Sequence, residues 1–515
     1  MAFVWVWAGS APARADLNRD LKLCQNHRAR PDVRIRSCTR LIRSQRFNKE
    51  NLALLFTARG NAFDDRGRRE RAIADYSEAI RLDPRHAMAY YNRGIVYGKS
   101  RKRPDLAIQD FTAAIGLDPA DFAAYVSRAE IYGRLKQWDK AIADYDFALS
   151  LRPRDAGVLF ARGEAHTARG EPRLGIADFD AALAITPRSA AVLHSRGRAY
   201  AETGKLEQAI ADYNAALHLR PKAAVIFLSR ALAYNKMGKY RWAIEDFNEA
   251  IPLRPKDAAG WYGRAIAHSG IGQYGRAVRD FSKSLELNPG DALALYGRGK
   301  ALSRRGHYDR AVKDFTAAID LKPETARFYF ARGAAQDKRG RHEAAIADYD
   351  RALGLRPDFT PVFRERGRAR FFLGRFKAAV PDLERSARAE PRDLFRLIWL
   401  YLARRRAGET AGDALTGSVA RFDLRRWPGP LVSMFLGRME DSEVLDRANR
   451  GSKKQRREQL SEAHFFIGQA RLLRGEKDQA AEHFRSVVKL RVKHFVVYTA
   501  ARAELRRLGG KKAAR

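Results

Sequence analysis

AIADYSEAIRLDP, at residues 72–84, is the stretch of sequence that decides the fold. Its apolar side chains recur at three- and four-residue spacing, which predicts a helix with one apolar stripe. The closing proline lacks an N–H and restricts the residue before it, so it ends the helix. Similar stretches follow along the chain, and they are closed by Pro84, Pro119, Pro153, Pro187, Pro221, Pro255, Pro289, Pro323, Pro357 and Pro391.

These prolines lie 34 residues apart, with a single interval of 35 between Pro84 and Pro119. A fixed period of this length indicates a solenoid of helix pairs. Twelve positions before each proline stands Ala or Gly; eight before it stands an aromatic residue, except for Leu383; five before it stands Ala or Ser. Small residues let two antiparallel helices approach closely, and the ring fills the space beside them. This pattern resembles the tetratricopeptide repeat, and the resemblance covers residues 51–391.

The chain is therefore expected to be all-α, a superhelical tetratricopeptide-repeat solenoid with capping helices. One helix pair cannot bury its own apolar face, so neighbouring repeats stabilise one another by stacking. Ten repeats are expected at 51–391, preceded by an N-terminal cap at 16–50 and followed by a C-terminal helical module at 392–515 that contains one degenerate repeat. A solenoid presents a long surface to another molecule, which predicts a binding scaffold.

Two charged positions recur in every repeat, an arginine in the first helix and an aspartate in the second. The arginines could form a ladder for an acidic ligand. Ten carboxylates at matched spacing favour instead an Arg–Asp pair that ties helices together, because a planar guanidinium suits a carboxylate. Whether each pair lies within one repeat or bridges two stays open. The positions are Arg59, Arg93, Arg128, Arg162, Arg196, Arg230, Arg264, Arg298, Arg332 and Arg366, with Asp75, Asp110, Asp144, Asp178, Asp212, Asp246, Asp280, Asp314, Asp348 and Asp382.

The tetratricopeptide resemblance implies that the first helix of each repeat lines an inner groove, with its fifth position pointing inward. That position holds Thr57, Tyr91, Val126, Phe160, His194, Leu228, Tyr262, Tyr296, Phe330 and Arg364. Aromatic rings suit contacts with peptide segments or sugar faces. The alternative is that these rings pack against the neighbouring helix.

Most of the charged groove candidates in the later repeats are basic, whereas Glu130, Glu164 and Glu202 make the earlier repeats mixed. The predicted ligand is thus a protein or peptide segment of apolar and acidic character, bound toward the C-terminal half. The predicted partner-binding residues are Tyr91, Phe160, Tyr262, Tyr296, Lys300, Phe330, Lys338, Arg364 and Arg368, and further basic candidates are Arg198, Lys236 and Arg304.

The N-terminus reads MAFVWVWAGSAPARADLNRD, a short apolar run followed by Ala13-Arg14-Ala15, a spacing that signal peptidase accepts. Residues 1–15 are therefore a candidate signal peptide. The run lacks preceding basic residues, a defect that a start site placed too far downstream would explain. The alternative is an uncleaved hydrophobic cap.

Cys24 and Cys38 are the only two cysteines, and in an exported protein such a pair predicts a disulfide. The residues before Cys24 are not the small uncharged ones of a lipid-attachment site, so no lipid anchor is expected. We therefore expect a soluble periplasmic protein, with a cytoplasmic location as the alternative.

Beyond Pro391 the period is lost, and Lys453–Arg457 is expected to be a basic linker. This tail resembles the NlpI family of bacterial envelope tetratricopeptide proteins. The resemblance implies an adaptor that brings peptidoglycan hydrolases together with a protease or synthesis machinery, and that can form a homodimer. The chain has many more repeats and lacks the lipid-modified cysteine. The stretches that carry the likeness are PRDLFRLIWLYLA at 391–403, WPGPLVSMFLGRM at 427–439, LSEAHFFIGQARLLRGEKDQAAEHFRSVV at 460–488 and HFVVYTAARAELRRLG at 494–509.

The net charge of +38, from 98 Lys and Arg against 60 Asp and Glu, favours anionic partners such as acidic proteins or an anionic envelope surface. Nucleic acid is less favoured, since no nucleic-acid-binding motif is present. Zinc-ligand spacing, phosphate-binding glycine loops and nucleophile elbows are absent from the sequence, so no metal, cofactor or catalysis is expected. The sequence predicts a non-catalytic adaptor of the cell envelope. The alternative is a cytosolic scaffold or a basic protein associated with nucleic acid or anionic lipid.

Overall fold

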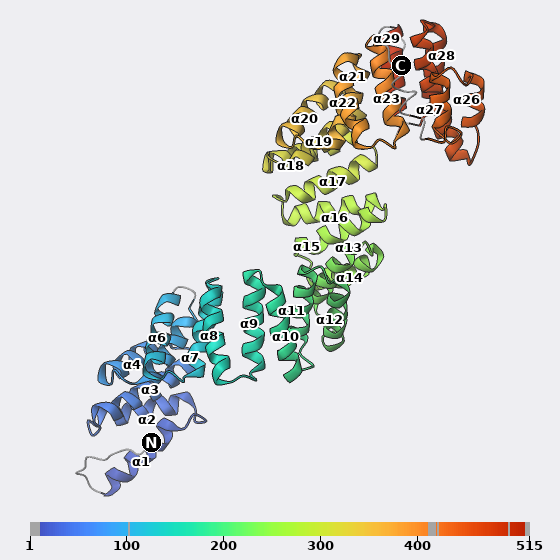
Figure 1. Ribbon diagram of the computed structural model, residues 1–515. Coiled ribbons are helices and arrows are strands. Elements are labelled where there is room, and N and C mark those ends of the chain that lie inside the picture. Colours follow the sequence, from blue (N-terminus) through green and yellow to red (C-terminus); the bar gives the residue numbers. More distant parts are fainter. Residues whose placement is uncertain (1–10, 101–102, 410–418, 420–421, 493–494, 510–515) are drawn as a thin grey trace. The chain divides into compact units, whose positions relative to one another are not determined.

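The computed structural model describes residues 11–100, 103–409, 419, 422–492 and 495–509, and this part of the chain is helical throughout, without strands. It divides into two compact units, Met1–Lys239 and Tyr240–Arg515. In each unit successive helices pack as antiparallel pairs, and each pair stacks on the next (Figure 1).

The first unit contains α1 (Ala11–Gln25), α2 (Pro31–Arg43), α3 (Lys49–Asp65), α4 (Arg69–Leu82), α5 (Ala87–Gly98), α6 (Pro104–Leu117), α7 (Phe122–Arg134), α8 (Trp138–Leu151), α9 (Ala156–Arg169), α10 (Pro172–Ile185), α11 (Ala190–Glu202), α12 (Leu206–Leu219) and α13 (Ala224–Lys236). The second contains α14 (Tyr240–Leu253), α15 (Ala258–Gly270), α16 (Tyr274–Leu287), α17 (Ala292–Arg304), α18 (Tyr308–Leu321), α19 (Ala326–Lys338), α20 (His342–Leu355), α21 (Thr360–Phe372), α22 (Phe376–Ala389), α23 (Leu394–Arg406), α25 (Gly429–Phe435), α26 (Asp441–Ala448), α27 (Lys453–Leu473), α28 (Lys477–Leu490) and α29 (Val496–Gly509). The all-α tetratricopeptide solenoid expected from the sequence is confirmed.

The pair α17–α18 shows how local sequence sets the repeat. Asp291 caps α17 by accepting hydrogen bonds from the N–H groups of Leu293 and Ala294, at 2.8 and 3.1 Å. Gly306 makes the turn between the helices with φ +80°, a conformation that favours glycine. α18 then ends at Leu321, two residues before the periodic Pro323.

Small residues set the spacing between the two helices of a pair. A Cβ atom placed on Gly299 of α17 would lie 2.6 Å from the Phe315 ring of α18, closer than atoms can pack. Phe315 is 1% exposed and Ala311 is fully buried. The small and aromatic residues that recur in the sequence therefore set the distance between the two helices of each repeat.

The arginine–aspartate ladder ties three helices at each step. Arg298 of α17 donates from Nε and Nη2 to both carboxylate oxygens of Asp314 on α18, at 2.9 and 2.8 Å. Its Nη1 donates to Ser282 Oγ on the preceding α16, at 3.2 Å. The question left open by the sequence is thus answered: the ion pair lies within a repeat, and the same guanidinium bridges to the repeat before it.

The same geometry recurs in both units. The intra-repeat pairs are Arg59–Asp75, Arg93–Asp110, Arg128–Asp144, Arg162–Asp178, Arg196–Asp212, Arg264–Asp280, Arg298–Asp314, Arg332–Asp348 and Arg366–Asp382. The Nη1 acceptors on the preceding repeat are Ser77, Thr112, Asp146, Asp180, Asn214, Asn248, Ser282, Thr316 and Asp350. These guanidinium groups are engaged by the fold, which supports the structural interpretation over a ligand ladder.

At the N-terminal end, Cys24 of α1 and Cys38 of α2 form a disulfide, and both are fully buried. Of the candidate signal peptide 1–15, residues 1–10 lie outside the described residues. α1 begins at Ala11 and runs continuously through the expected cleavage point between Ala15 and Asp16. None of the described helices combines the length and apolar character needed to cross a bilayer.

The C-terminal module keeps one repeat-like pair, α27–α28, in which Gly468 packs against Phe484 as glycines do in the repeats. The expectation of a basic linker at Lys453–Arg457 is wrong, because these residues form the first turn of the 21-residue helix α27. The reason is a capping box: the Gln455 N–H donates to Ser452 Oγ at 3.4 Å, and the Ser452 N–H donates to Gln455 Oε1 at 3.0 Å.

Replacing Arg298 by Leu is expected to destabilise the second unit by about 3 kcal/mol, since a buried ion pair loses one partner and leaves the other charge uncompensated. Asp314 is only 10% exposed. Thermal unfolding followed by circular dichroism measures the effect. Arg305→Leu, an exposed arginine at the end of the same helix, is the matched control. Equal melting temperatures for the two variants would contradict a structural role.

Replacing Cys38 by Ser is expected to destabilise the α1–α2 cap by about 3 kcal/mol, because the disulfide closes a loop across 14 positions of sequence. Hydrogen exchange read by mass spectrometry should show faster exchange in α1 and α2 and unchanged exchange in the second unit. Unaltered protection in α1 and α2 would mean that the cap does not depend on the disulfide.

Candidate functional site

Two adjoining pockets in the second unit, which we call the C-terminal groove, share Arg304 as a lining residue. The first has a volume of about 380 Å³ and is lined by Tyr262, Ile266, Ser269, Tyr274, Phe281, Leu293, Tyr296, Gly297, Lys300, Ala301, Arg304 and Arg327. The second has a volume of about 700 Å³, and its lining includes Arg304, Phe330, Asp337, Lys338, Arg364, Glu365, Arg368, Phe395, Trp399, Glu462, Phe466 and Val497. Seven of the nine residues expected to bind a partner therefore lie in this groove.

The aromatic residues at the fifth helix position both pack and line the groove. Tyr262 contacts the Phe281 ring at a centroid distance of 5.8 Å, and Tyr296 contacts Phe315 at 5.9 Å. Phe330 contacts Tyr349 at 6.1 Å in the same way. The sequence left open whether these rings line the groove or pack against a helix. In the structure they do both: one side of each ring packs on the second helix, and the half-buried ring also lines a pocket.

Cations lie over the aromatic surface of the first pocket. Lys300 Nζ is 5.4 Å from the centre of the Tyr296 ring, and the Arg327 guanidinium is 5.5 Å from the same ring. Burial raises the pKa of the Tyr262 and Tyr296 hydroxyls, which keeps both neutral at physiological pH. This pocket therefore offers rings, hydroxyl groups and positive charge to one ligand.

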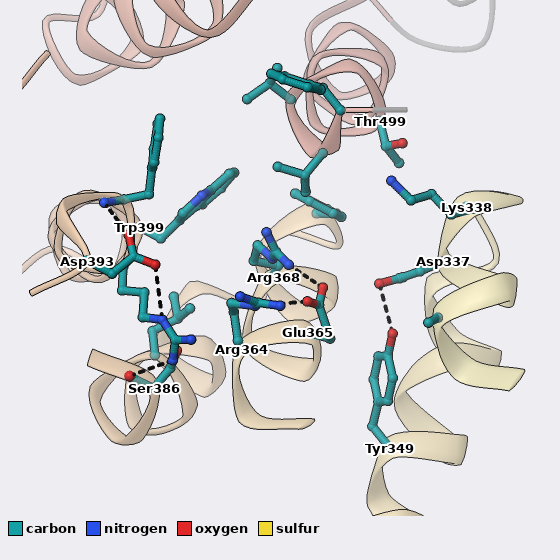
Figure 2. A pocket seen from close by; sticks show the side chains of 18 of the residues that line it. Asp337, Lys338, Tyr349, Arg364, Glu365, Arg368, Ser386, Asp393, Trp399 and Thr499 are labelled. Carbon is teal, nitrogen blue, oxygen red and sulfur yellow. Dashed lines mark hydrogen bonds and ion pairs between the residues drawn. The ribbon is translucent and has the colours of Figure 1, made fainter. Parts of the chain in front are cut away.

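The second pocket has a charged floor built on α21. Arg364 and Arg368 both contact Glu365, the former at 2.9 Å (Figure 2). Burial opposes the charge on Glu365, but the two guanidinium groups outweigh it and hold the pKa of this carboxyl below its usual value. The Nε atom of Arg368 is buried and has no hydrogen-bond partner in the described part of the chain. Two arginines face one carboxylate, so the floor keeps an excess of positive charge.

The wall on α19 carries a second carboxyl. Asp337 contacts His342 Nδ1 at 2.8 Å. It also accepts a long hydrogen bond from the Tyr349 hydroxyl at 3.4 Å (Figure 2). Burial raises the pKa of Asp337 and lowers the pKa of the neighbouring Lys338. An anion entering this pocket would favour the charged form of Lys338, since a nearby opposite charge opposes the effect of burial.

The far wall of the second pocket comes from the C-terminal module. Trp399 of α23 and Phe466 of α27 pack edge to face at 5.7 Å, and Val496 and Val497 of α29 complete the wall. Arg396 is held away from the solvent, since its Nη1 donates to the Ser386 carbonyl oxygen at 2.9 Å and its Nε faces Asp393 at 3.3 Å. The C-terminal module thus adds an apolar end to a cationic pocket.

Glu462 is a half-buried carboxyl in the lining of the second pocket. It accepts a hydrogen bond from Trp427 Nε1 at 2.8 Å. Burial raises the pKa of Glu462 to about 7, with a smaller contribution from the charge of Glu458 and an opposing one from the Trp427 hydrogen bond. The wall is therefore less negative at mildly acidic pH.

The two remaining aromatic candidates, Tyr91 and Phe160, lie in the first unit. Each packs on the second helix of its repeat, Tyr91 on Phe111 at 5.8 Å and Phe160 on Phe179 at 5.9 Å. A pocket of about 690 Å³ in this unit is lined by other residues, among them Trp138, Tyr145, Glu130 and Glu164. Neither Tyr91 nor Phe160 lines this pocket.

Sequence reasoning missed Asp337, Glu365, Trp399 and Glu462. Glu365 directly follows Arg364 in the sequence, and this adjacency could have indicated that part of the positive charge of the arginines is compensated. Trp399 and Glu462 belong to the non-periodic tail, where no repeat position assigns them to a face. Among the residues described, no cluster of three or more His, Cys, Asp or Glu side chains could hold a metal ion.

The stacked helix pairs and the groove along their first helices define a helical-repeat binding scaffold. A tetratricopeptide repeat model matches residues 99–157, 126–190, 262–305 and 296–358. A TPR repeat model matches 60–100 and 197–238, and a further tetratricopeptide repeat model matches 224–257. Together these matches span more than half of the sequence, and the chain belongs to the tetratricopeptide-repeat proteins.

Similar solved structures include a tetratricopeptide repeat protein from Parabacteroides merdae, which is 21% identical with a TM-score of 0.39; the match covers 48% of this chain and 97% of that one. YrrB, described as a TPR protein with an unusual peptide-binding site, is 22% identical with a TM-score of 0.33, over 36% of this chain and 96% of YrrB. MamA from Desulfovibrio magneticus RS-1 is 20% identical with a TM-score of 0.32, over 33% of this chain and 95% of MamA.

Replacing Glu462 by Gln is expected to remove a pH-dependent loss of stability. The unfolded carboxyl titrates near 4.5 and the folded one at about 7, so the folded chain holds a proton that the unfolded chain releases between these values. The stabilisation is complete below the lower value and is lost as the pH rises through the upper one, by about 3 kcal/mol. The melting temperature of E462Q should therefore rise relative to that of the native chain as the pH increases.

Glutamine can still accept the Trp427 hydrogen bond, so the variant isolates the titration. Melting temperatures compared at about pH 4.5 and about pH 8 measure it. The exposed Glu482, changed to Gln, serves as the control and should show no such pH-dependent difference. A constant difference between E462Q and the native chain at both pH values would contradict the raised pKa.

Proposed function

We propose that this chain is a non-catalytic scaffold that binds an apolar and acidic segment of a partner protein in its C-terminal groove. The observation that carries the proposal is that two pockets with aromatic and cationic linings adjoin at Arg304, which lines both. Tetratricopeptide-repeat proteins bind protein or peptide partners, and the proposal assigns that activity to particular residues.

The balance of charges in the groove supports an acidic partner segment. Lys300 and Arg304 are exposed and line the pockets. In the second pocket Arg364 and Arg368 share the single carboxylate of Glu365. The carboxyl of Asp337 contacts His342 and the Tyr349 hydroxyl. An aspartate or glutamate side chain would gain charge-assisted hydrogen bonds here.

The apolar part of the segment would contact the rings. Tyr262 and Tyr296 line the first pocket, and Phe330, Trp399 and Phe466 line the second. Aromatic side chains give large contact areas with little loss of conformational freedom, so they dominate the energy of many interfaces. The segment is therefore an alternation of apolar and acidic residues long enough to span both pockets.

We place this scaffold in the bacterial cell envelope, where it would recruit cell-wall hydrolases or proteases. Two observations support this part of the proposal: the Cys24–Cys38 disulfide, which is typical of oxidising compartments, and the resemblance of the tail to the NlpI family. The sequence alternative, a cytosolic scaffold, would leave the disulfide without an oxidising environment. Fusing residues 1–50 to alkaline phosphatase separates the two, since that enzyme becomes active only after export.

Selection of a random peptide library displayed on phage against the full chain tests the groove. Enrichment of peptides that combine aromatic or aliphatic residues with Asp or Glu is expected. The variant K300E/R304E should lose at least about tenfold in affinity for an enriched peptide, because like charges then face its carboxylates. The triple variant Y262A/Y296A/F330A should lose affinity as well.

The matched control is R305E/R310E, which reverses two exposed arginines of the same repeat that do not line either pocket. Circular dichroism confirms that each variant is folded. Equal affinity of K300E/R304E and R305E/R310E would show that the groove is not the binding site. Capture from an envelope extract with the native chain and K300E/R304E then asks whether hydrolases or proteases depend on the same residues.

A further inference from the structure

The C-terminal end of α28 lies beside the N-terminal turn of α27. Arg457 of α27 donates from Nε and Nη2 to the carbonyl oxygen of Leu490 on α28, at 2.9 and 2.7 Å. The capping box at Ser452 fixes where α27 begins, so the residues after it occupy defined helical positions. One end of the helix pair is thus an ordered surface.

Six exposed cations gather at this end. They are Lys453, Lys454 and Arg456 of α27, Arg485 and Lys489 of α28, and Arg491, which follows α28 directly. A helix rises about 1.5 Å per residue, so along their helices all six lie within about 8 Å of the contact between Arg457 and Leu490. We call this set the cationic end.

The cationic end differs from the arginine ladder of the repeats. Within the described residues, none of its six side chains forms an ion pair or a side-chain hydrogen bond, whereas nine arginines of the repeat ladder each form an ion pair with an aspartate. The nearest acidic side chains along the two helices are Glu458 and Glu482. Six like charges held close together raise the free energy of the folded chain unless anions gather there.

We propose that the cationic end binds the surface of a membrane that contains anionic phospholipids. Clusters of four to eight Lys and Arg side chains on a helix surface attract anionic headgroups, with a contribution from each side chain near the membrane. Residues 453, 454, 456 and 457 lie on the same side of α27, within one half of the helix circumference. Several of their side chains can therefore contact the phosphates of one membrane surface together. The charges complement a surface that carries many phosphates.

A membrane fits this end better than nucleic acid does. The segments 453–457 and 485–491 contain no aromatic residue, so they offer no platform on which unpaired bases could stack. The Cys24–Cys38 disulfide is typical of an oxidising compartment, where DNA and RNA are not the prevailing polyanions. Binding at the cationic end does not depend on the C-terminal groove, so the two sites can be tested separately.

Co-sedimentation of the full chain with lipid vesicles tests the proposal. The vesicles contain phosphatidylcholine alone or phosphatidylcholine mixed with phosphatidylglycerol. The native chain should bind the anionic vesicles and be released by salt. The variant K453Q/K454Q/R456Q/R485Q should bind them at least about tenfold more weakly. Arg457 is left intact in this variant because it holds the two helices together.

The matched control removes four exposed arginines of the first unit, in the variant R68Q/R69Q/R154Q/R188Q, which has the same net charge. Its binding should stay within about threefold of the native value if the site is local. Equal weakening of both variants would overturn the proposal, because the whole-chain charge would then explain binding. Binding to neutral vesicles as strong as to anionic ones would overturn it too.

A labelled DNA duplex provides the remaining comparison. If K453Q/K454Q/R456Q/R485Q loses affinity for the duplex and keeps its affinity for anionic vesicles, the cationic end is a nucleic-acid site and the proposal is wrong. Thermal unfolding of each variant confirms that the loss of binding is not a loss of fold.

Discussion

A three-way contact of the repeat arginines fixes the orientation of neighbouring helices in the solenoid. Its Nε and Nη2 bind an aspartate of the same repeat, while Nη1 reaches an acceptor on the repeat before it, as Arg162 does with Asp178 and Asp146. Apolar stacking supplies most of the stabilisation between neighbouring repeats, but it is not directional. The planar guanidinium adds direction, since its donors satisfy both neighbours only when the helices keep a fixed offset. This fixed offset also sets the distance between the groove residues of successive repeats.

The residues that line the groove also keep the packing contacts of the repeat. Tyr296 packs on Phe315 with one side of its ring and lines a pocket with the rest, so one residue contributes to both the packing and the pocket. Lys300 and Arg304 lie one and two helical turns further along α17, and both are exposed to solvent and line the first pocket. The non-periodic tail supplies Trp399 and Phe466, which give the second pocket an apolar wall, and Glu462, which adds a carboxyl to the same lining.

The sequence predicted the helix pairs, the arginine–aspartate register and seven of the groove residues because each is encoded at a fixed offset from a periodic proline. It could not predict the Nη1 contacts, because their acceptors vary among Ser, Thr, Asn and Asp. It also could not show that Arg364 and Arg368 share Glu365, a contact that depends on side-chain packing. The start of α27 was misread as a linker, because five consecutive polar residues resemble one until the Ser452 capping box is recognised.

The variety of Nη1 acceptors has a consequence for how such a chain can change over generations. Ser77, Thr112, Asn214 and Asp350 differ in shape and charge, yet each offers one oxygen to the guanidinium of the next repeat. The polar contact between repeats therefore requires only a short side chain with an acceptor oxygen, while the apolar contacts recur at the same positions of each repeat. A repeat can be duplicated, lost or exchanged by recombination without redesigning its neighbours. The number of repeats can therefore change during evolution without new packing contacts between the repeats.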